Sequence, residues 1–182
     1  MVGSVVSIVI VNWDGLPHLK ISLPSLQKIN YPNYEIILVD NGSTDGSIEY
    51  LKAQMSKLKT TAQKLKLRLI ENRKNLGFAK ANNQGFKKAK GEYILFLNND
   101  TKVTPDFLTK LVNVMEEDKK IGVVQPKIVF MDSGTLQAGG AFLTNTGFLY
   151  HFGFGKDPDD KNITREWKFF PPMARVCWLK ER

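Results

Sequence analysis

Apolar strand-like runs alternate along this chain with segments of helical periodicity, and this alternation limits the folds that the chain can adopt. Strands are expected at residues 5–11, 35–39, 67–70 and 93–97. Helices are expected at residues 16–29, 48–65, 79–89 and 104–117. Strands that alternate with helices form βαβ units, in which the strands are parallel and the helices cover the sheet. The sequence therefore predicts an α/β fold, a mainly parallel sheet flanked by helices.

Prolines and capping residues refine these expected elements. Pro24 should kink or shorten the first helix, because proline lacks an N–H and clashes with the preceding turn. The Thr-Pro-Asp sequence at residues 104–106 predicts an N-cap followed by proline at the first helical position. Residues 93–97 are apolar throughout, which is typical of a strand buried on both faces. Residues 121–130 are expected to form one or two further strands, broken at Pro126.

The length of the chain favours one domain. The chain has 182 residues, of which 42% are hydrophobic, and this is too short for two comfortable domains. We therefore expect a single globular unit over residues 1–182. The periodic signal fades after Met131 into glycine-rich and aromatic sequence, which fits either a short β-ribbon or an ordered loop.

Positive charge is concentrated in one part of the sequence. The formal net charge is +8, yet residues 51–90 contain twelve Lys and Arg against one acid, Glu71. The basic segment at residues 52–90 could contact an anionic membrane, a polyphosphate or a nucleic acid, and the alternative is a solvated helix face. The apolar run at residues 5–11 is too short to span a bilayer. A single cysteine, Cys177, fits a reducing compartment.

Polar side chains follow three of the expected strands at their carboxyl ends, where ligands bind in open α/β sheets. These side chains are Asn12, Trp13 and Asp14, then Asp40 and Asn41, then Asn98, Asn99 and Asp100. A carboxylate at the end of a buried strand is costly unless a cation or hydrogen-bond donors pair with it. Asp100 is accordingly either a ligand for Mg²⁺ or Mn²⁺ or a turn cap, and Asp40 either contacts a ligand or closes a hydrogen-bonded turn. Trp13 fits the core or a stacking surface for a nucleobase.

Absent motifs exclude other classes of site. The chain has no G-x-G-x-x-G after its first strand, no P-loop and no nucleophile elbow. Its two histidines, His18 and His151, lack partners at metal-ligand spacing.

Three ordered motifs resemble those of the family 2 glycosyltransferases of the GT-A fold, which is a Rossmann-related α/β fold. The motifs are VSIVIVNWDG, EIILVDNGSTDGS and ENRKNLGFAKANNQGFKKAKGEYILFLNNDTKVTPDFL. The match covers about the first 130 residues and is strongest to the rhamnosyltransferase-like branch. The resemblance implies transfer of a sugar from a nucleotide-diphosphate sugar to an acceptor hydroxyl, with inversion and with a divalent metal, Mg²⁺ or Mn²⁺. The acceptor would be a saccharide or a lipid-linked molecule.

The resemblance also implies roles for particular residues. Those at the nucleotide and donor sugar are Val11, Asn12, Trp13, Asp40, Asn75, Gly77, Phe78, Asn82, Asn83, Asn98 and Asn99. Of these, Val11, Asn12 and Trp13 would stand where the first strand meets the base, and Asp40 would hydrogen-bond it. Asp100 is the implied metal ligand. Because Asn98 replaces the first aspartate of the family's D-x-D motif, metal binding should depend on Asp100 and the diphosphate.

A second departure from the family concerns the catalytic base. None of the carboxylates after Asp132 stands in the family's Glu-Asp type motif, so the base is expected beyond Arg182. Residues 1–131 would form the donor-binding core, and residues 132–182 the start of an acceptor-side region. The expected location is cytoplasmic, with peripheral contact at the inner face of the membrane through residues 52–90, and no nucleic acid is expected as a partner.

Two other functions remain open from the sequence. A nucleotidyltransferase-like protein would share the sheet and the metal-phosphate chemistry, but residues 12–17 are not the glycine-rich basic loop that it should carry. A noncatalytic nucleotide or polyanion-binding module would use the basic segment. Steep salt dependence would indicate a polyanion, whereas loss of binding with a chelator would indicate a metal-bridged nucleotide sugar.

Overall fold

The computed structural model describes residues 4–60, 66–143 and 149–160. The chain divides into two compact units, Met1–Thr109 and Lys110–Arg182, which we call the sheet unit and the C-terminal unit. This division falls earlier than the boundary after residue 131 that the sequence suggested, and the assignment of residues 1–182 to one domain stays a prediction. Among the described residues, no helix has the length and apolar character needed to cross a membrane.

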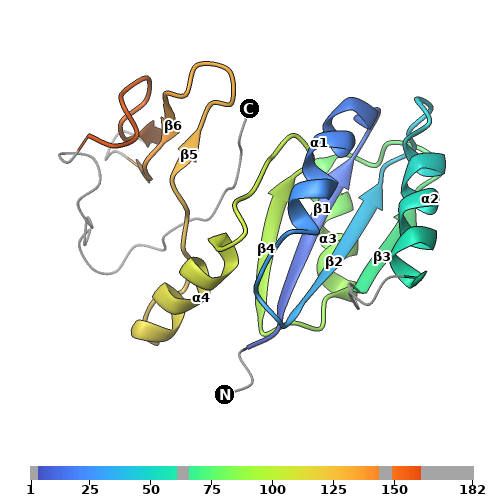
Figure 1. The fold of residues 1–182 in the computed structure, drawn as a ribbon, viewed down its shortest axis with the longest axis horizontal. Helices are drawn as coiled ribbons and strands as arrows, with labels where there is room; N and C mark the ends of the chain where they lie inside the picture. Colours follow the sequence, from blue (N-terminus) through green and yellow to red (C-terminus); the bar gives the residue numbers. More distant parts are fainter. Residues whose placement is uncertain (1–3, 61–65, 144–148, 161–182) are drawn as a thin grey trace. The chain divides into compact units, whose positions relative to one another are not determined.

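The sheet unit is built on four parallel strands in the order β3-β2-β1-β4 (Figure 1). The strands are β1 (Val6–Asn12), β2 (Tyr34–Asp40), β3 (Lys66–Glu71) and β4 (Tyr93–Asn98). The helices between them are α1 (Leu16–Leu26), α2 (Ser47–Thr60) and α3 (Phe78–Lys88). In Figure 1, α1 and α2 lie on one face of the sheet and α3 lies on the other. The predicted parallel α/β fold is confirmed.

The core of this unit lies along the two central strands. Ile8 and Ile10 of β1 pair in register with Ile36 and Leu38 of β2, and all four side chains are fully buried. Side chains alternate between the two faces of a strand, so these four lie on one face of the sheet. Burying each branched side chain stabilises the fold by about 1.5–3 kcal/mol. The two strands therefore hold their carboxyl ends at a fixed relative height.

The structure differs from the expected burial of β4 and from the expected end of α1. β4 is not buried on both faces: Leu95 and Leu97 are buried, whereas Ile94 and Phe96 are half-buried. In the described sheet β4 is an edge strand, so one of its faces is less covered. Pro24 lies inside α1, and the helix ends two residues later at Leu26 and not at the expected residue 29, which agrees with the predicted shortening.

The fourth helix, α4 (Phe107–Glu117), starts later than expected, and Thr104 is not its N-cap. The Thr104 hydroxyl donates to Oδ1 of Asp106 at 2.9 Å, and the first helical residue, Phe107, lies three positions further on. The carbonyl of Pro105 accepts the N–H of Asn30 at 2.9 Å. Because the carbonyl of Pro105 is bonded outside the helix, residues 104–106 form a turn and the helix begins after them.

The C-terminal unit contains short antiparallel ribbons. β5 (Ile128–Val129) pairs with β6 (Leu136–Ala138), and β7 (Ala141–Leu143) pairs with β8 (Leu149–His151). Of the two possibilities that the sequence left open after Met131, the β-ribbon is correct. The expected strands at residues 121–130 shrink to the two residues of β5, since Pro126 cannot donate a ladder hydrogen bond.

Candidate functional site

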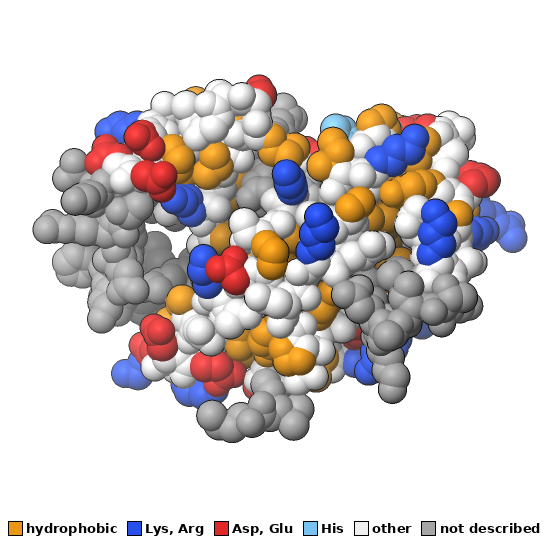
Figure 2. Space-filling view, in the orientation of Figure 1, with side chains coloured by type: hydrophobic (Ala, Val, Ile, Leu, Met, Phe, Trp, Pro, Cys, Tyr) orange, Lys and Arg blue, Asp and Glu red, His pale blue; other side chains and the backbone are white. Residues whose placement is uncertain are grey.

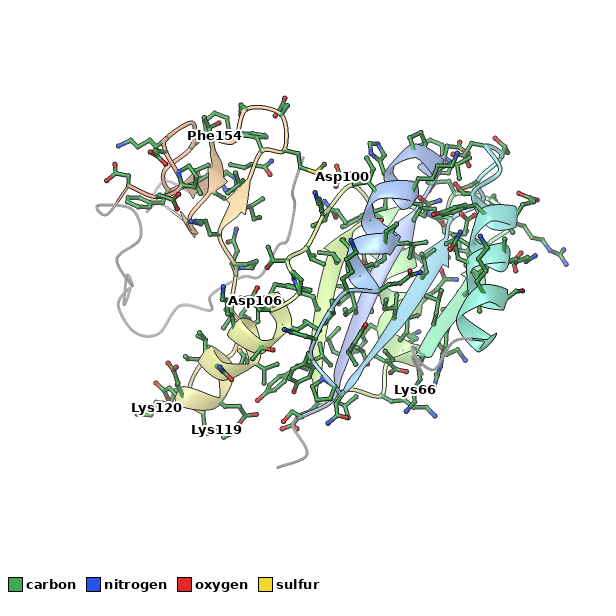
Figure 3. The ribbon with its side chains drawn as sticks, viewed as in Figure 1. Lys66, Asp100, Asp106, Lys119, Lys120 and Phe154 are labelled. Atoms are coloured by element: carbon green, nitrogen blue, oxygen red, sulfur yellow. The ribbon has the colours of Figure 1, made fainter. Side chains whose placement is uncertain are left out.

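The carboxyl ends of β1, β2 and β4 bring together the polar residues that the sequence singled out. Asn12 is the register partner of Asp40, and Val11 is the register partner of Asn98. Figure 3 labels Asp100 just beyond the carboxyl end of β4. The candidate site is therefore formed by residues of one compact unit, on three adjacent strands.

Hydrogen bonds join the three strand ends through their amide side chains. The side-chain amide of Asn12 donates to Oδ2 of Asp40 at 3.0 Å, and Oδ1 of Asn12 accepts from Nδ2 of Asn99 at 2.8 Å. Asn12 is fully buried, so both ends of its amide need partners inside the protein. It thus links β2 to the segment that follows β4 and fixes the spacing between them.

Asp40 is the centre of a tight turn after β2. Its side chain is 0% exposed. Besides Asn12, it accepts the backbone N–H of Ser43 at 2.9 Å and the Ser43 hydroxyl at 2.7 Å. Ser43 Oγ in turn accepts the N–H of Asp14 at 2.9 Å. Asp40 therefore closes the hydrogen-bonded turn that the sequence offered as one alternative, and its contact with a nucleobase stays a prediction.

Two aromatic side chains of the site are exposed. The Trp13 side chain directly after β1 is 57% exposed, and Phe78 at the start of α3 is 51% exposed. The alternative that Trp13 belongs to the core is therefore wrong. An exposed indole next to polar strand ends offers a flat apolar surface of the kind on which a base stacks.

Amide side chains also fix the loop between β3 and α3. Oδ1 of Asn41 accepts from Nδ2 of Asn72 and from the N–H of Leu76, each at 3.0 Å. Nδ2 of Asn41 donates to Oδ1 of Asn75 at 2.8 Å. Asn72 is held by reciprocal amide bonds with Gln84 of α3, at 2.8 and 3.0 Å. The loop over residues 72–77 is thereby attached to both β2 and α3.

Gly77 at the end of this loop and Gly42 in the turn after β2 are each required, for different reasons. Gly77 has a φ of +85° and precedes α3, a conformation that other residues rarely adopt. A Cβ there would meet no atom within 4 Å, so the space beside Gly77 is open. At Gly42 a Cβ would lie 2.7 Å from the Cα of Lys74. The turn after β2 and the 72–77 loop can approach each other only because Gly42 has no side chain.

The remaining predicted residues lie on the same elements. Asn82 of α3 donates its side-chain amide to the carbonyl of Phe78 at 3.0 Å, which ties it to its own helix. Asn83 is exposed, whereas Val11, Asn98 and Asn99 are partly buried. Of the predicted set, Asn12, Asp40 and Asn99 are connected directly, and Asn75 joins through Asn41.

Asp100 carries the one observation that bears on a metal. Its Oδ1 is buried and accepts no hydrogen bond from any described residue. A buried carboxylate oxygen without a donor is costly, and a divalent cation would satisfy it. The described residues contain no group of three or more Asp, Glu, His or Cys arranged for a metal. Asp100 alone would fit Mg²⁺ or Mn²⁺ as a single carboxylate ligand, since these ions usually take one or two protein carboxylates and complete their shell with phosphate oxygens and water.

Asp45, which the sequence reading did not single out, joins two helices beside the site. Its carboxylate accepts the N–H of Leu16 at 2.8 Å and the N–H of Ser47 at 3.0 Å. These are the first residues of α1 and α2, where N–H groups have no partner within the helix. Slight burial opposes ionisation, but hydrogen bonds from Ser47 and from the N–H of Leu16 lower the pKa of Asp45 from its ordinary 3.8.

Other contributors were missed because their roles depend on tertiary contacts. Ser43, Asn72 and Gln84 are polar residues in turns or on a helix, where such residues are common without a function. The only available signal for Ser43 was the turn sequence DNGSTDG between β2 and α2. Cys177, Glu166 and Glu181 lie outside the described residues.

Comparison with solved structures identifies the class of fold. The chain is similar to TarS of S. aureus, solved in complex with UDP-GlcNAc, with a TM-score of 0.55 and 22% identity over 69% of this chain and 34% of that one. It is also similar to the mannosyltransferase PcManGT of Pyrobaculum calidifontis, solved with GDP-Man and Mn²⁺, with a TM-score of 0.60 and 22% identity over 71% of this chain and 36% of that one. The fold is that of the GT-A glycosyltransferases.

Sequence comparison shows the family. The model of glycosyl transferase family 2 matches residues 7–170, and the chain belongs to that family. One relative, an uncharacterized glycosyltransferase of Haemophilus influenzae, is 36% identical over 110 residues, which are 60% of this chain and 42% of the relative. The chain spans between 34% and 42% of the length of this relative and the next two curated relatives.

Proposed function

We propose that this chain binds a nucleotide-diphosphate sugar at the carboxyl edge of its sheet, as the donor-binding part of an inverting, metal-dependent glycosyltransferase. The observation that carries the proposal is Oδ1 of Asp100, a buried oxygen without a hydrogen-bond donor among the described residues. Asn99, the residue before it, belongs to the hydrogen-bonded group that joins β1, β2 and the end of β4. A ligand that brings its own cation would remove the cost of that buried charge.

The donor would be bound by the set of residues already placed at this edge. Trp13 would stack on the base, and Val11, Asn12 and Asp40 would shape the base pocket. The loop ending at Gly77 and the first turn of α3, with Asn75, Phe78, Asn82 and Asn83, would line the nucleotide and sugar. The UDP-GlcNAc and GDP-Man complexes of the two similar structures support a nucleotide sugar as the ligand class.

The reaction would be a single displacement. The acceptor hydroxyl attacks the anomeric carbon, the bond from that carbon to the diphosphate oxygen breaks, and the configuration inverts. A general base takes the hydroxyl proton. A divalent metal bound at Asp100 would neutralise negative charge on the departing diphosphate. Asn98 and Asn99 would orient the diphosphate without adding negative charge beside it.

The acceptor and the base are further parts of the proposal. We expect a saccharide or lipid-linked acceptor and a hexosyl or rhamnosyl donor. The described carboxylates after Asp132 are Asp157, Asp159 and Asp160, and none stands in the family's Glu-Asp type motif. We therefore propose that this chain does not itself supply the base. A cytoplasmic location stays a prediction.

Calorimetric titration with a panel of nucleotide sugars, with and without Mn²⁺, tests the proposal. Binding should require Mn²⁺ and disappear with a chelator. Asp100→Asn should lower the Mn²⁺-dependent affinity at least about tenfold, since even partners outside the coordination shell typically contribute that much to metal affinity. Asp132→Asn, an exposed carboxylate in the other unit, is the matched control. Unchanged affinity in a folded Asp100→Asn chain would refute the metal assignment.

A further inference from the structure

The basic excess of residues 51–90 gathers at one place in the sheet unit. Lys66 and Arg68 lie at the start of the edge strand β3, Lys87 and Lys88 lie in the last turn of α3, and Lys90 follows that helix. Nη1 of Arg68 donates to the carbonyl of Lys88 at 3.4 Å, so the strand and the helix end are in contact. We call these five residues the basic cluster.

A single buried carboxylate, Glu35, binds two members of the basic cluster, Arg68 and Lys90. Glu35, whose side chain is 4% exposed, accepts the backbone N–H of Lys90 at 2.8 Å and the Ser7 hydroxyl at 2.8 Å through Oε1. Its Oε2 lies 3.5 Å from Nη2 of Arg68. Glu35 is therefore already paired, and the four exposed lysines around it project into solvent. Glu92, two residues after Lys90, is exposed. The five cations of the basic cluster therefore outnumber the two carboxylates Glu35 and Glu92.

An exposed aromatic residue accompanies these cations. Phe86 is 53% exposed and directly precedes Lys87 on α3. Figure 2 shows basic side chains at the lower edge of the sheet unit. In Figure 3, Lys66 and Asp100 lie at opposite ends of the sheet, so the cluster is at the end away from the candidate donor site. A partner bound to the cluster would leave that site open.

We infer that the basic cluster and Phe86 form a docking surface for a bilayer that contains anionic lipids. Lysines near such a surface are attracted to its negative potential, and a neighbouring aromatic ring can enter the headgroup region. Single-stranded nucleic acid would instead be held by several aromatic side chains that stack on successive bases. Beside the basic cluster, the described residues place one exposed aromatic side chain, that of Phe86. The inference does not depend on the proposed function.

Cosedimentation of the 182-residue chain with sucrose-loaded vesicles tests this surface. The chain should bind vesicles of phosphatidylcholine with phosphatidylglycerol and not vesicles of phosphatidylcholine alone, and added salt should weaken binding. The variant with Lys66→Gln, Lys88→Gln and Lys90→Gln should bind about a hundredfold more weakly, because each lysine contributes roughly fivefold. Phe86→Ser should weaken binding as well.

The matched control carries Lys20→Gln, Lys28→Gln and Lys120→Gln, which remove the same charge from exposed positions outside the cluster. It should bind vesicles like the wild type. Both triple variants should keep wild-type affinity for nucleotide sugar, so failure of one proposal is distinguishable from failure of the other. Equal vesicle binding by both triple variants, or no binding by the wild type, would overturn the inference. Binding of single-stranded RNA without binding of anionic vesicles would overturn it too.

Discussion

At the scale of single residues, the site depends on side chains whose hydrogen bonds are mostly satisfied within the protein. Asp40 and Asn12 are fully buried and bonded to each other and to Ser43 or Asn99. Trp13, by contrast, is exposed at the same edge. The buried residues therefore shape the edge, and the exposed residue is free to contact a ligand.

Trp13→Ala should weaken binding of the free nucleotide while leaving the fold intact. Stacking on an aromatic side chain contributes about 1–3 kcal/mol per base, which corresponds to roughly five- to a hundredfold in affinity. Calorimetry with the nucleoside diphosphate measures the change. Phe86→Ala serves as the control, because it removes an aromatic ring of similar exposure near the C-terminal end of α3. Wild-type affinity in Trp13→Ala would mean that the indole has no role in binding.

Asp40→Asn should destabilise the chain as well as weaken nucleotide binding. Three donors converge on the Asp40 carboxylate, and an amide nitrogen in place of one oxygen would face a donor. Hydrogen bonds to a charged group contribute about 1.5–3 kcal/mol, so a loss of that order is expected in the free energy of unfolding. Urea unfolding followed by circular dichroism measures it. Full stability with reduced affinity would instead indicate a direct contact with the ligand.

At the scale of elements, the helices are fixed at their ends by contacts from elsewhere in the chain. Asp45 joins the N-termini of α1 and α2, and the amide of Asn72 joins the 72–77 loop to α3. Periodicity predicted these helices because each must bury one face against the sheet. It did not predict the late start of α4, since the carbonyl of Pro105 is bonded to Asn30, which is distant in sequence.

The lowered pKa of Asp45 predicts a pH dependence of stability. A carboxyl with a lower pKa in the folded state stabilises the fold above its unfolded pKa, near 3.8, and loses this effect as the pH falls through the folded value. Asp45→Asn should therefore reduce stability at neutral pH and flatten the loss of stability below pH 3.8. Unfolding by urea on both sides of that pH measures the difference. Parallel pH profiles for the variant and the wild type would contradict the assigned role.

At the scale of the whole molecule, the sequence predicted the parallel sheet and its carboxyl edge correctly. Strand ends that carry Asn12, Asp40 and Asn98 meet at one edge, because parallel strands all end on the same side. The connections among Asn41, Asn72 and Gln84 could not be predicted. Amide side chains suit many turns and helices, and only the folded chain decides which of them meet.

The whole chain should bind and slowly hydrolyse a nucleotide sugar but transfer it poorly to an acceptor. A positioned base contributes about 10² to 10⁴-fold, and positioning of the acceptor adds further to the rate. Release of nucleoside diphosphate and formation of glycosylated product, measured in the same reaction, give the two rates. Hydrolysis should exceed transfer. Efficient transfer would show that a carboxylate of this chain after Asp132 acts as the base.

The strand order has a consequence for how the chain reaches its native state. β4 is the last strand of the sheet to be synthesised, yet it pairs with β1, the first. The hydrogen bond from the N–H of Gly91 to Ser7 joins residues 84 positions apart. Contacts between residues so far apart in sequence form slowly, because a long loop must close before they contribute. On the ribosome, the apolar strand β1 therefore keeps one edge unpaired until nearly a hundred residues have emerged, and during that interval it is open to association with other chains.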